Sequence, residues 1–231
     1  MGAPTLLPPV KLFLSALSAD EAILDSVGER LSQLLGPVDR VTAKHPWNFS
    51  PAYTRELGSS LQRRYVVLSG LYRPECLPDI KIRTNELEAK LTFGALGERR
   101  INLDPGYVSG SQVILASTKR YANRVYLRDG IYADLTLYYD GREFQPLSRF
   151  TFPEYRTRAA RRFFGSLRVR YLEELRSYES HCAVSRLSEA LLSPVEGGGE
   201  GVQGKLDRNA SVGVEDSDPE TCVASVGRAA V

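Results

Sequence analysis

The segment from residue 99 to residue 141 constrains the fold most, because strand-like runs alternate there with tight turn signals. We interpret the Arg-Asp-Gly sequence at 128–130 as a three-residue hairpin loop with its glycine in the left-handed conformation. This register places Val125 opposite Ala133 and continues an apolar face along the second strand through Leu137 to Tyr139. A two-residue loop would mix apolar and polar side chains on both faces. The segment therefore predicts β-hairpins with one apolar and one polar face.

The polar face of the first hairpin is a candidate site. Arg124 and Asp134 become cross-strand neighbours in this register. Three tyrosines flank this pair, namely Tyr126, Tyr132 and Tyr138. One interpretation is a solvated sheet face with an ordinary surface ion pair. The other is the floor of a binding site, where the tyrosines stack on a ligand or hydrogen-bond to it.

A polar row on a predicted helix could join that site. The helix is predicted over residues 74–91, and Lys81, Asn85 and Glu88 recur along one flank of it at helical spacing. A solvated flank with an i,i+4 polar pair explains the same pattern. The functional alternative is a polar row at the rim of a cleft over the sheet.

Polar residues at two predicted strand ends complete the candidate set. The Asp-Pro-Gly sequence at 104–106 predicts a turn, and Asn102 and Asp104 would lie together where the strand ends. Lys119 follows a strand predicted over 112–117 and could bind an anion. The candidate ligand-binding residues are Lys81, Asn85, Glu88, Asn102, Asp104, Lys119, Arg124, Tyr126, Tyr132 and Asp134.

The chemistry expected of these residues is that of an anion site. Arg124 or Lys119 would hold an anionic group such as a nucleotide phosphate. Asp104 or Asp134 would bind Mg²⁺ if a nucleotide binds, or act as a base if the protein is an enzyme.

Composition predicts one domain and a tail. The 231 residues are 42% hydrophobic and 25% charged, which is typical of a globular protein. From residue 183 the chain becomes rich in Gly, Ser and acidic residues. We therefore expect a single domain over 1–182 and a disordered tail over 183–231. The tail carries four basic and eight acidic residues, which leaves a net charge of about +6 on the domain.

Cysteine spacing and hydropathy indicate the compartment. Cys76, Cys182 and Cys222 are far apart and form no CxxC pair, so neither a zinc site nor a disulfide framework is predicted. We expect reduced thiols in a cytoplasmic protein. No apolar run reaches the roughly 18 residues of a membrane-spanning helix, so no membrane partner is expected.

The remaining elements predict an α+β fold. Asp20 caps a helix that ends near Leu35, and strands are predicted over 10–16, 38–43 and 62–69. Together with the hairpins, they form an antiparallel-rich sheet of about five to seven strands. We expect the helices to pack on its apolar face.

A helix predicted over residues 154–178 suggests a different function. Seven arginines crowd its flanks beside aromatic residues, a pattern found at nucleic-acid surfaces. A solvated helix, partly neutralised by three glutamates, is the plainer interpretation. RNA association through this helix is one alternative function, and a non-catalytic interaction protein is the other.

The order of several motifs resembles one bacterial family. The motifs include IKIRTNELE at 80–88, INLDPGY at 101–107, LASTKRYANRVYLRDGIYADLTLYY at 115–139 and FPEYR at 152–156. The chain resembles the domain of unknown function 4416 family (DUF4416) over about residues 8–178, nearly the whole predicted domain. Family members usually have histidine where this chain has Asn123, a position that falls on the apolar-face parity, and tyrosine in place of Ala52.

The resemblance implies no established activity. Members are sometimes labelled GTP-binding proteins, but this chain has no NKxD segment. The P-loop-like GEGVQGK at 199–205 has Leu206 where Ser or Thr is required. The residues favour a small-ligand or nucleotide-binding protein with its polar site on the sheet.

Overall fold

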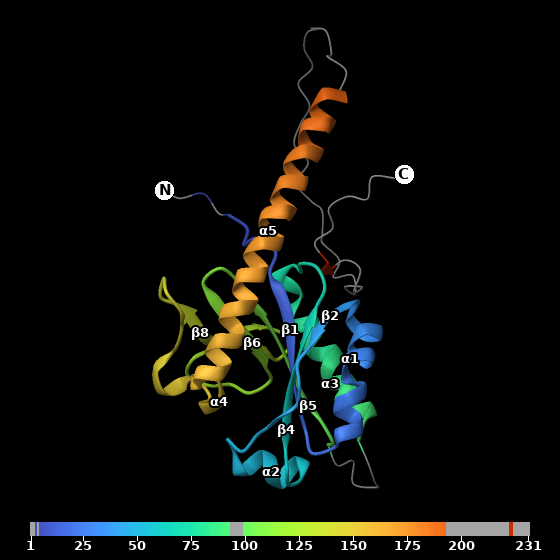
Figure 1. Ribbon diagram of the computed structural model, residues 1–231, viewed down its shortest axis with the longest axis vertical. Coiled ribbons are helices and arrows are strands. Elements are labelled where there is room, and N and C mark those ends of the chain that lie inside the picture. The colour runs from blue at the N-terminus through green and yellow to red at the C-terminus, as the bar shows by residue number, and fades with distance from the viewer. Residues whose placement is uncertain (1–2, 4, 93–98, 193–221, 224–231) are drawn as a thin grey trace.

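An antiparallel sheet with helices on both faces forms the body of the protein in this computed structural model (Figure 1). The structure describes residues 3, 5–92, 99–192 and 222–223. The strands are β1 (Lys11–Ser18), β2 (Val38–Val41), β3 (His45–Pro46), β4 (Gln62–Leu68), β5 (Asn102–Val108), β6 (Gln112–Ser117), β7 (Arg124–Arg128), β8 (Ile131–Tyr139) and β9 (Phe144–Pro146). Their order is β2-β4-β1-β5-β6-β8-β7, with β3 paired to β4 and β9 to β8.

The helices confirm the α+β class and cover more of the sheet than expected. The α-helices are α1 (Glu21–Leu35), α2 (Pro51–Leu57), α3 (Leu77–Lys90), α4 (Pro153–Arg156) and α5 (Arg158–Leu192), and two short 3₁₀ turns span Pro74–Cys76 and Ser148–Phe150. Helices α1 and α3 pack on one face of the sheet, and α4 and α5 pack on the other. The expectation of helices on a single apolar face is therefore wrong.

Strand β1 shows why both faces are covered. All eight of its residues are buried, with Leu12 and Leu14 packed toward α1 and Phe13 packed toward α5. A run that is apolar on both faces is typical of a strand with helices on either side. The sequence LFLSAL at 12–17 carried this signal.

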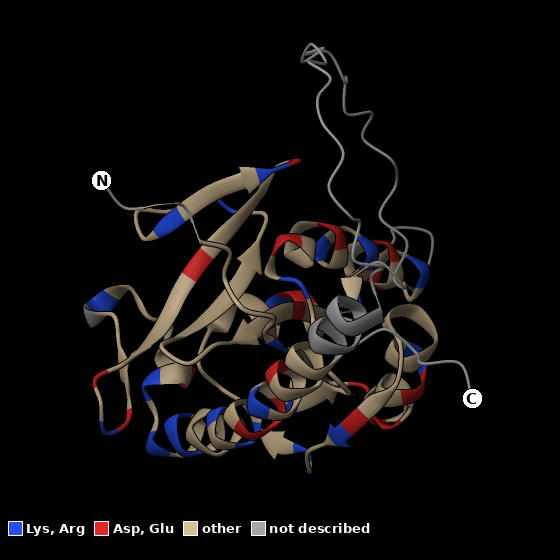
Figure 2. Ribbon diagram, turned by 90° about the horizontal axis from the view of Figure 1, so that it is seen from above, with Lys and Arg blue, Asp and Glu red and all other residues tan. Residues whose placement is uncertain are grey.

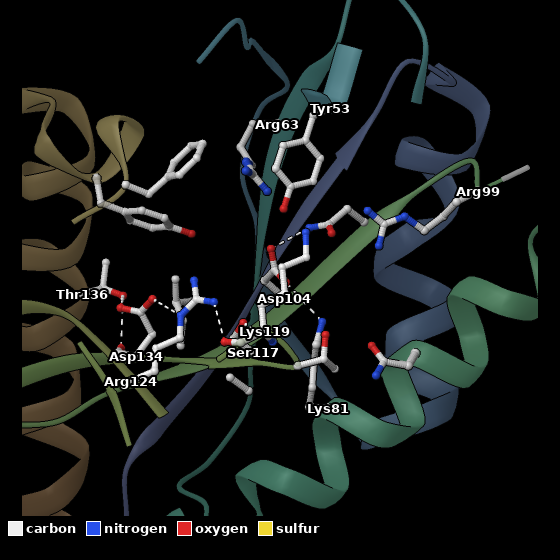
Figure 3. Close-up of a pocket in the computed structure, with 17 residues that line it drawn as sticks. Tyr53, Arg63, Lys81, Arg99, Asp104, Ser117, Lys119, Arg124, Asp134 and Thr136 are labelled. Atoms are coloured by element: carbon white, nitrogen blue, oxygen red, sulfur yellow. Dashed lines mark hydrogen bonds and ion pairs between the residues drawn. The ribbon is translucent and has the colours of Figure 1, made fainter. Parts of the chain in front are cut away.

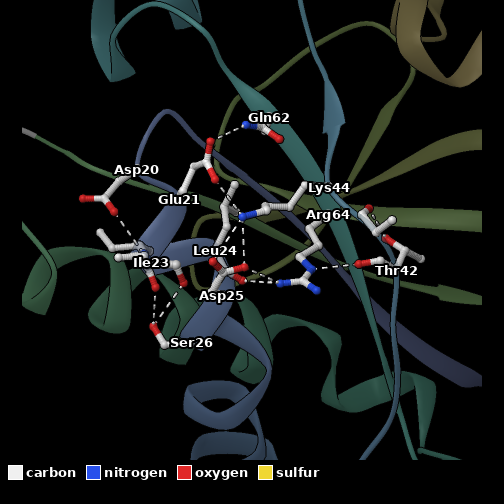
Figure 4. Close-up of polar contacts among 12 residues, drawn as sticks. Asp20, Glu21, Ile23, Leu24, Asp25, Ser26, Thr42, Lys44, Gln62 and Arg64 are labelled. Carbon is white, nitrogen blue, oxygen red and sulfur yellow. Dashed lines mark hydrogen bonds and ion pairs between the residues drawn. The ribbon is translucent and has the colours of Figure 1, made fainter.

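Charged side chains dock α1 against the edge of the sheet (Figure 4). The Asp20 side chain caps the helix by accepting from the Ile23 N–H at 3.0 Å, as predicted. Lys44 Nζ lies 3.0 Å from carboxylate oxygens of both Glu21 and Asp25. Because the carboxylates of these pairs are largely exposed to solvent, the pairs orient α1 and contribute little to the stability of the fold.

The β7–β8 hairpin has the predicted pairing with a different turn. Arg124 lies opposite Asp134 and Val125 opposite Ala133, as predicted. Asp129 and Gly130 both have positive φ, so the loop has two residues. A bulge at Leu127 restores the register that a three-residue loop would have given.

A β-bulge at Thr136 reverses the face of the sheet to which the following side chains of β8 point. Val113 pairs with Leu137 and Ile114 with Leu135, so β8 carries one extra residue between these pairs. Leu135 therefore packs on the α3 side, whereas Leu137 packs toward α5. The predicted apolar face of this strand does not continue through Leu137, because the bulge reverses it.

The predicted turn at 104–106 is also wrong, because these residues lie inside β5. Asp104, Pro105 and Gly106 pair with β1 along its length. The N–H and C=O groups of Leu103 point away from β1, toward α3. Pro105 lies two residues further along the strand, so its backbone nitrogen points to the same side. The missing N–H of Pro105 therefore faces a stretch where β5 has no partner strand, since β5–β6 pairing begins only at Gly106.

The C-terminal half departs from the predicted helix boundaries. The predicted helix over 154–178 is two helices, α4 and α5, separated by Thr157 in an extended conformation. Helix α5 continues to Leu192, which is within the segment predicted to be the tail. The P-loop-like segment at 199–205 lies outside the described residues.

Cys222 and Val223 pack against the domain. Cys222 forms a disulfide with Cys76 at the start of α3, and its carbonyl accepts from the Arg73 N–H at 2.9 Å. Val223 forms a β-bridge with Tyr72. The expectation of reduced thiols is wrong for this pair, while Cys182 is free. The two cysteines are 146 residues apart, so no local motif marks them.

None of the helices in the described part of the chain is both long enough and apolar enough to cross a membrane.

Candidate functional site

The candidate site lies where two neighbouring strands part. β5 and β6 pair only between Gly106–Val108 and Val113–Leu115. A Cβ atom at Gly106 would lie 2.4 Å from the Ile114 carbonyl oxygen, so glycine allows the close approach there. Beyond Gly106 the two strands are unpaired, and the backbone of β5 is open on that side.

Helix α3 satisfies the open backbone of β5. Lys81 Nζ donates to the Leu103 carbonyl at 2.7 Å, and the Leu103 N–H donates to Glu88 Oε1 at 2.6 Å. Both side chains are buried, and each replaces one hydrogen bond that a partner strand would have made. Two members of the predicted polar row therefore have a structural role beside the pocket.

A pocket of about 140 Å³ occupies the gap (Figure 3). Arg63 from β4 and Tyr53 from α2 enter from one side, and Lys81 from α3 enters from another. Arg124 and Asp134 form the wall on the β7–β8 side. Side chains from four separate parts of the chain thus converge on one cavity.

Most of the predicted site residues line this pocket. Glu88 lies beside it, bonded to β5, and Tyr126 and Tyr132 lie on an adjoining shallow hollow. Arg124 lines both hollows. The predicted residues in the pocket are Lys81, Asn85, Asn102, Asp104, Lys119, Arg124 and Asp134.

Asp104 lies between cationic and amide partners. Its carboxylate accepts from Lys81 Nζ at 3.1 Å and from Asn102 Nδ2 at 2.6 Å. Burial on its own would raise the pKa of Asp104, but Lys81, Arg63 and the Asn102 hydrogen bond outweigh it and hold that pKa below its usual value. Asp104 therefore stays ionised in the pocket.

This lowered pKa predicts a pH effect on stability. The folded state binds the Asp104 proton more weakly than the unfolded state, so Asp104 stabilises the fold above its unfolded pKa of about 3.9 and loses this effect as pH falls. We expect the stability difference between wild type and Asp104→Asn to be largest near neutral pH and to shrink below about pH 5. Urea unfolding across this range measures it. A constant difference would contradict the account.

The Arg124–Asp134 pair forms the opposite wall. Arg124 Nε lies 2.8 Å from Asp134 Oδ2, and Arg124 Nη1 donates to the Lys119 carbonyl at 2.8 Å. Asn123 Nδ2 donates to Asp134 Oδ1 at 2.9 Å, so Asn123 faces the polar side and not the apolar side that its parity suggested. Asn123 precedes β7, where strand alternation does not apply.

Arg63 is the residue that sequence reasoning missed. Its side chain is 4% exposed, and its Nε and Nη2 donate to the Glu154 carboxylate at 3.0 and 2.8 Å. The same carboxylate accepts from Trp47 Nε1 at 2.6 Å and from the Tyr65 hydroxyl at 3.0 Å. Burial is the largest single effect on the pKa of Arg63 and would lower it, but Glu154 and the other acidic groups around it outweigh burial and raise that pKa above its usual value.

One nitrogen of Arg63 is left without a partner. Nη1 is buried and forms no hydrogen bond within the described part of the chain, although Arg63 lines the pocket. A buried donor without an acceptor is costly. The sequence held one signal for the burial of Arg63. This basic residue lies on the same face of β4 as Tyr65 and Val67, which both pack in the core.

Tyr53 and Arg99 close the rim near α2. Burial, followed by the charge of Asp104, raises the pKa of Tyr53 to about 12, so its phenol remains a neutral donor. Arg99 forms ion pairs with Glu56 and Glu88. Burial raises the pKa of Glu88, although Lys81 and the Leu103 N–H oppose it.

The charge of the pocket favours an anion over a cation. Five basic side chains line it, from Arg63, Lys81, Arg99, Lys119 and Arg124, against the two acidic side chains of Asp104 and Asp134. Behind this lining, Glu154 pairs with Arg63, and Glu88 pairs with Arg99, so Lys119 is the lining cation with no carboxylate partner among the described residues. Both candidate metal ligands already have a cationic partner. Among the described residues, no group of three or more His, Cys, Asp or Glu side chains lies together as metal ligands do.

The fold and the site define an α+β protein whose antiparallel sheet opens into a cationic pocket. The chain belongs to the family described as Domain of unknown function (DUF4416), whose model matches residues 8–171. This match confirms the resemblance drawn from the motifs. No match was found among curated proteins or among solved structures. The family description specifies no activity, so the pocket is the feature of this protein that indicates a function.

Proposed function

We propose that this protein binds a small ligand through an oxyanion, such as a phosphate or carboxylate group, in the pocket between β5 and β6. The observation that carries the proposal is the buried, unpaired Nη1 of Arg63, a residue whose side chain lines the cavity. An oxyanion supplies the acceptor that this donor lacks. Glu154 holds the guanidinium on its other side, so the free nitrogen is fixed in advance of binding.

Other donors of the pocket support the same ligand. Lys119 Nζ and the Asn85 amide have no hydrogen-bond partner within the described ranges, and both line the cavity. Both carboxylates of the pocket are already paired, so the groups left over are mostly donors. A donor-rich, cationic site complements an anion with several acceptor oxygens.

The arginine-rich helix is less suited to RNA than its sequence indicates. Arg161 pairs with Glu143, Arg168 stacks 3.6 Å over the Tyr139 ring, and Arg170 pairs with Asp39 and Glu174. These arginines hold α5 to the sheet instead of presenting free charge to phosphates. Lys and Arg are interspersed with Asp and Glu along the helices in Figure 2. These contacts therefore favour ligand binding in the pocket over RNA association through α5.

A thermal-shift titration tests the proposal. The panel comprises phosphate, pyrophosphate, sugar phosphates, nucleotides and small carboxylic acids, each with and without Mg²⁺. A ligand at a hundred times its Kd adds about 2.7 kcal/mol of stability, which raises the Tm by about 5–10 °C for a domain of this size.

Matched lysine variants locate the binding. Lys119→Gln removes an exposed cation of the pocket and should weaken a binding anion by about tenfold. Lys90→Gln removes an exposed lysine at the end of α3, outside the pocket, and should leave the shift unchanged. If no panel member stabilises the wild type, or if both variants respond alike, the proposal is wrong.

A further inference from the structure

The pocket is too small to enclose most metabolites. Its volume is about 140 Å³, whereas pockets that enclose drug-sized ligands span about 300–1,000 Å³. It can hold one anionic group, and the rest of any larger ligand must lie on the surface beside it. The chemistry of that neighbouring surface therefore indicates the class of ligand.

An aromatic hollow adjoins the pocket on the same face of the sheet. We call it the tyrosine shelf and define it by Tyr121, Tyr126 and Tyr132. Arg124 lines both the pocket and the shelf, so the two are continuous. Tyr126 lies two residues beyond Arg124 on β7, which places the shelf about 7 Å along the strand from the pocket wall.

Two tyrosines of the shelf are exposed, and each ring contacts a neighbouring aromatic or arginine side chain. Tyr121 and Tyr126 are 59% and 56% exposed, which is unusual for large aromatic side chains. The Tyr126 and Tyr132 rings meet edge to face at 5.3 Å, and the Arg124 guanidinium lies 5.9 Å from the Tyr121 ring centroid. An open aromatic surface with an adjacent arginine suits a flat heterocycle, which stacks on ring faces.

We infer that the ligand is a nucleoside phosphate, with its phosphate in the pocket beside Arg63 and Lys119 and its base on the tyrosine shelf. This inference rests on the proposed oxyanion site and adds the class of ligand. Because Arg124 lines both hollows, a ligand that occupies both passes this side chain, with its charged group on the pocket side and its flat ring on the shelf side. Stacking accepts any base, so the shelf selects the class of compound and not one particular base.

Calorimetric titration of the full chain separates the two parts of the site. The titrants are inorganic phosphate, the uncharged nucleosides and the four nucleoside 5′-monophosphates. For the wild type, we expect at least one monophosphate to bind about tenfold more tightly than inorganic phosphate. Tyr126→Ala should abolish this advantage and leave the affinity for inorganic phosphate unchanged. Tyr138→Ala, an exposed tyrosine of β8 outside both hollows, is the control and should change neither affinity.

The outcomes distinguish the inference from the proposed function. Binding of inorganic phosphate without any gain from a nucleoside overturns the inference and leaves the oxyanion site standing. A nucleotide advantage that survives Tyr126→Ala also overturns it. If neither phosphate nor any nucleotide binds the wild type, both are wrong. A 5′-phosphorylated oligonucleotide that binds more tightly than the mononucleotide would overturn the free nucleotide as the ligand.

Discussion

Replacing Glu154 by glutamine should lower the free energy of unfolding by about 3–5 kcal/mol, because it leaves the buried charge of Arg63 without a counter-charge. The Glu154 carboxylate accepts hydrogen bonds from Arg63, Trp47 and Tyr65, and one amide oxygen cannot replace all of them. For a chain of this length the Tm should fall by about 10 °C. Urea unfolding monitored by the fluorescence of Trp47, the only tryptophan, measures the loss.

Two comparisons isolate the charge effect. Glu173→Gln changes an exposed glutamate of α5 and should alter the unfolding free energy by less than about 0.5 kcal/mol. The double variant Arg63→Met with Glu154→Leu removes both charges together. Its loss of unfolding free energy should be far smaller than the summed losses of the single variants Arg63→Met and Glu154→Leu. An additive double variant would mean that the two side chains are not coupled.

Loss of the Cys76–Cys222 disulfide should cost about 2–4 kcal/mol, because the bond closes a loop of 146 residues in the unfolded chain. Cys222 is also buried among Tyr72, Cys76 and Ile80, so its release exposes part of the core. Cys222→Ser should therefore unfold at lower urea concentration than the oxidised wild type, and reductant should have no further effect on it.

The third cysteine provides the control for the disulfide. Cys182→Ser changes a half-buried free thiol and should retain the full sensitivity of the wild type to reductant. Thiol titration of the unfolded, unreduced wild type should find one reactive thiol per chain. Three reactive thiols, with a stability that does not respond to reductant, would show that the bond does not form.

The pairing of Arg124 with Asp134 could be predicted because its determinants are local. An Asp-Gly turn signal and the alternation of apolar residues on each side fix the register of β7 and β8. The length of the loop could not be predicted, since a two-residue turn with a bulge at Leu127 gives the same register as a three-residue loop. The bulge at Thr136 has no sequence signal of its own, and it reversed the face of Leu137.

The pocket itself depends on contacts between distant parts of the chain. Arg63 and Glu154 are 91 residues apart, and neither lies in a motif that names a partner. The Asp-Pro-Gly sequence at 104–106 has strong turn propensity, but its pairing with β1 overrides that propensity. Most of the polar residues that line the pocket could be predicted from the sequence, because their side chains lie on predicted polar faces. The sequence could not place the gap between β5 and β6 that brings them together.

The oxyanion site is tested most directly by a crystal structure of the protein soaked in tungstate, a heavy tetrahedral oxyanion. We expect an anomalous peak in the gap between β5 and β6, with one oxygen within about 3 Å of Arg63 Nη1. Lys119→Gln crystals under the same conditions should show a weaker peak at the same position. Tungstate bound only elsewhere on the surface, with Arg63 Nη1 facing water, would contradict the central claim.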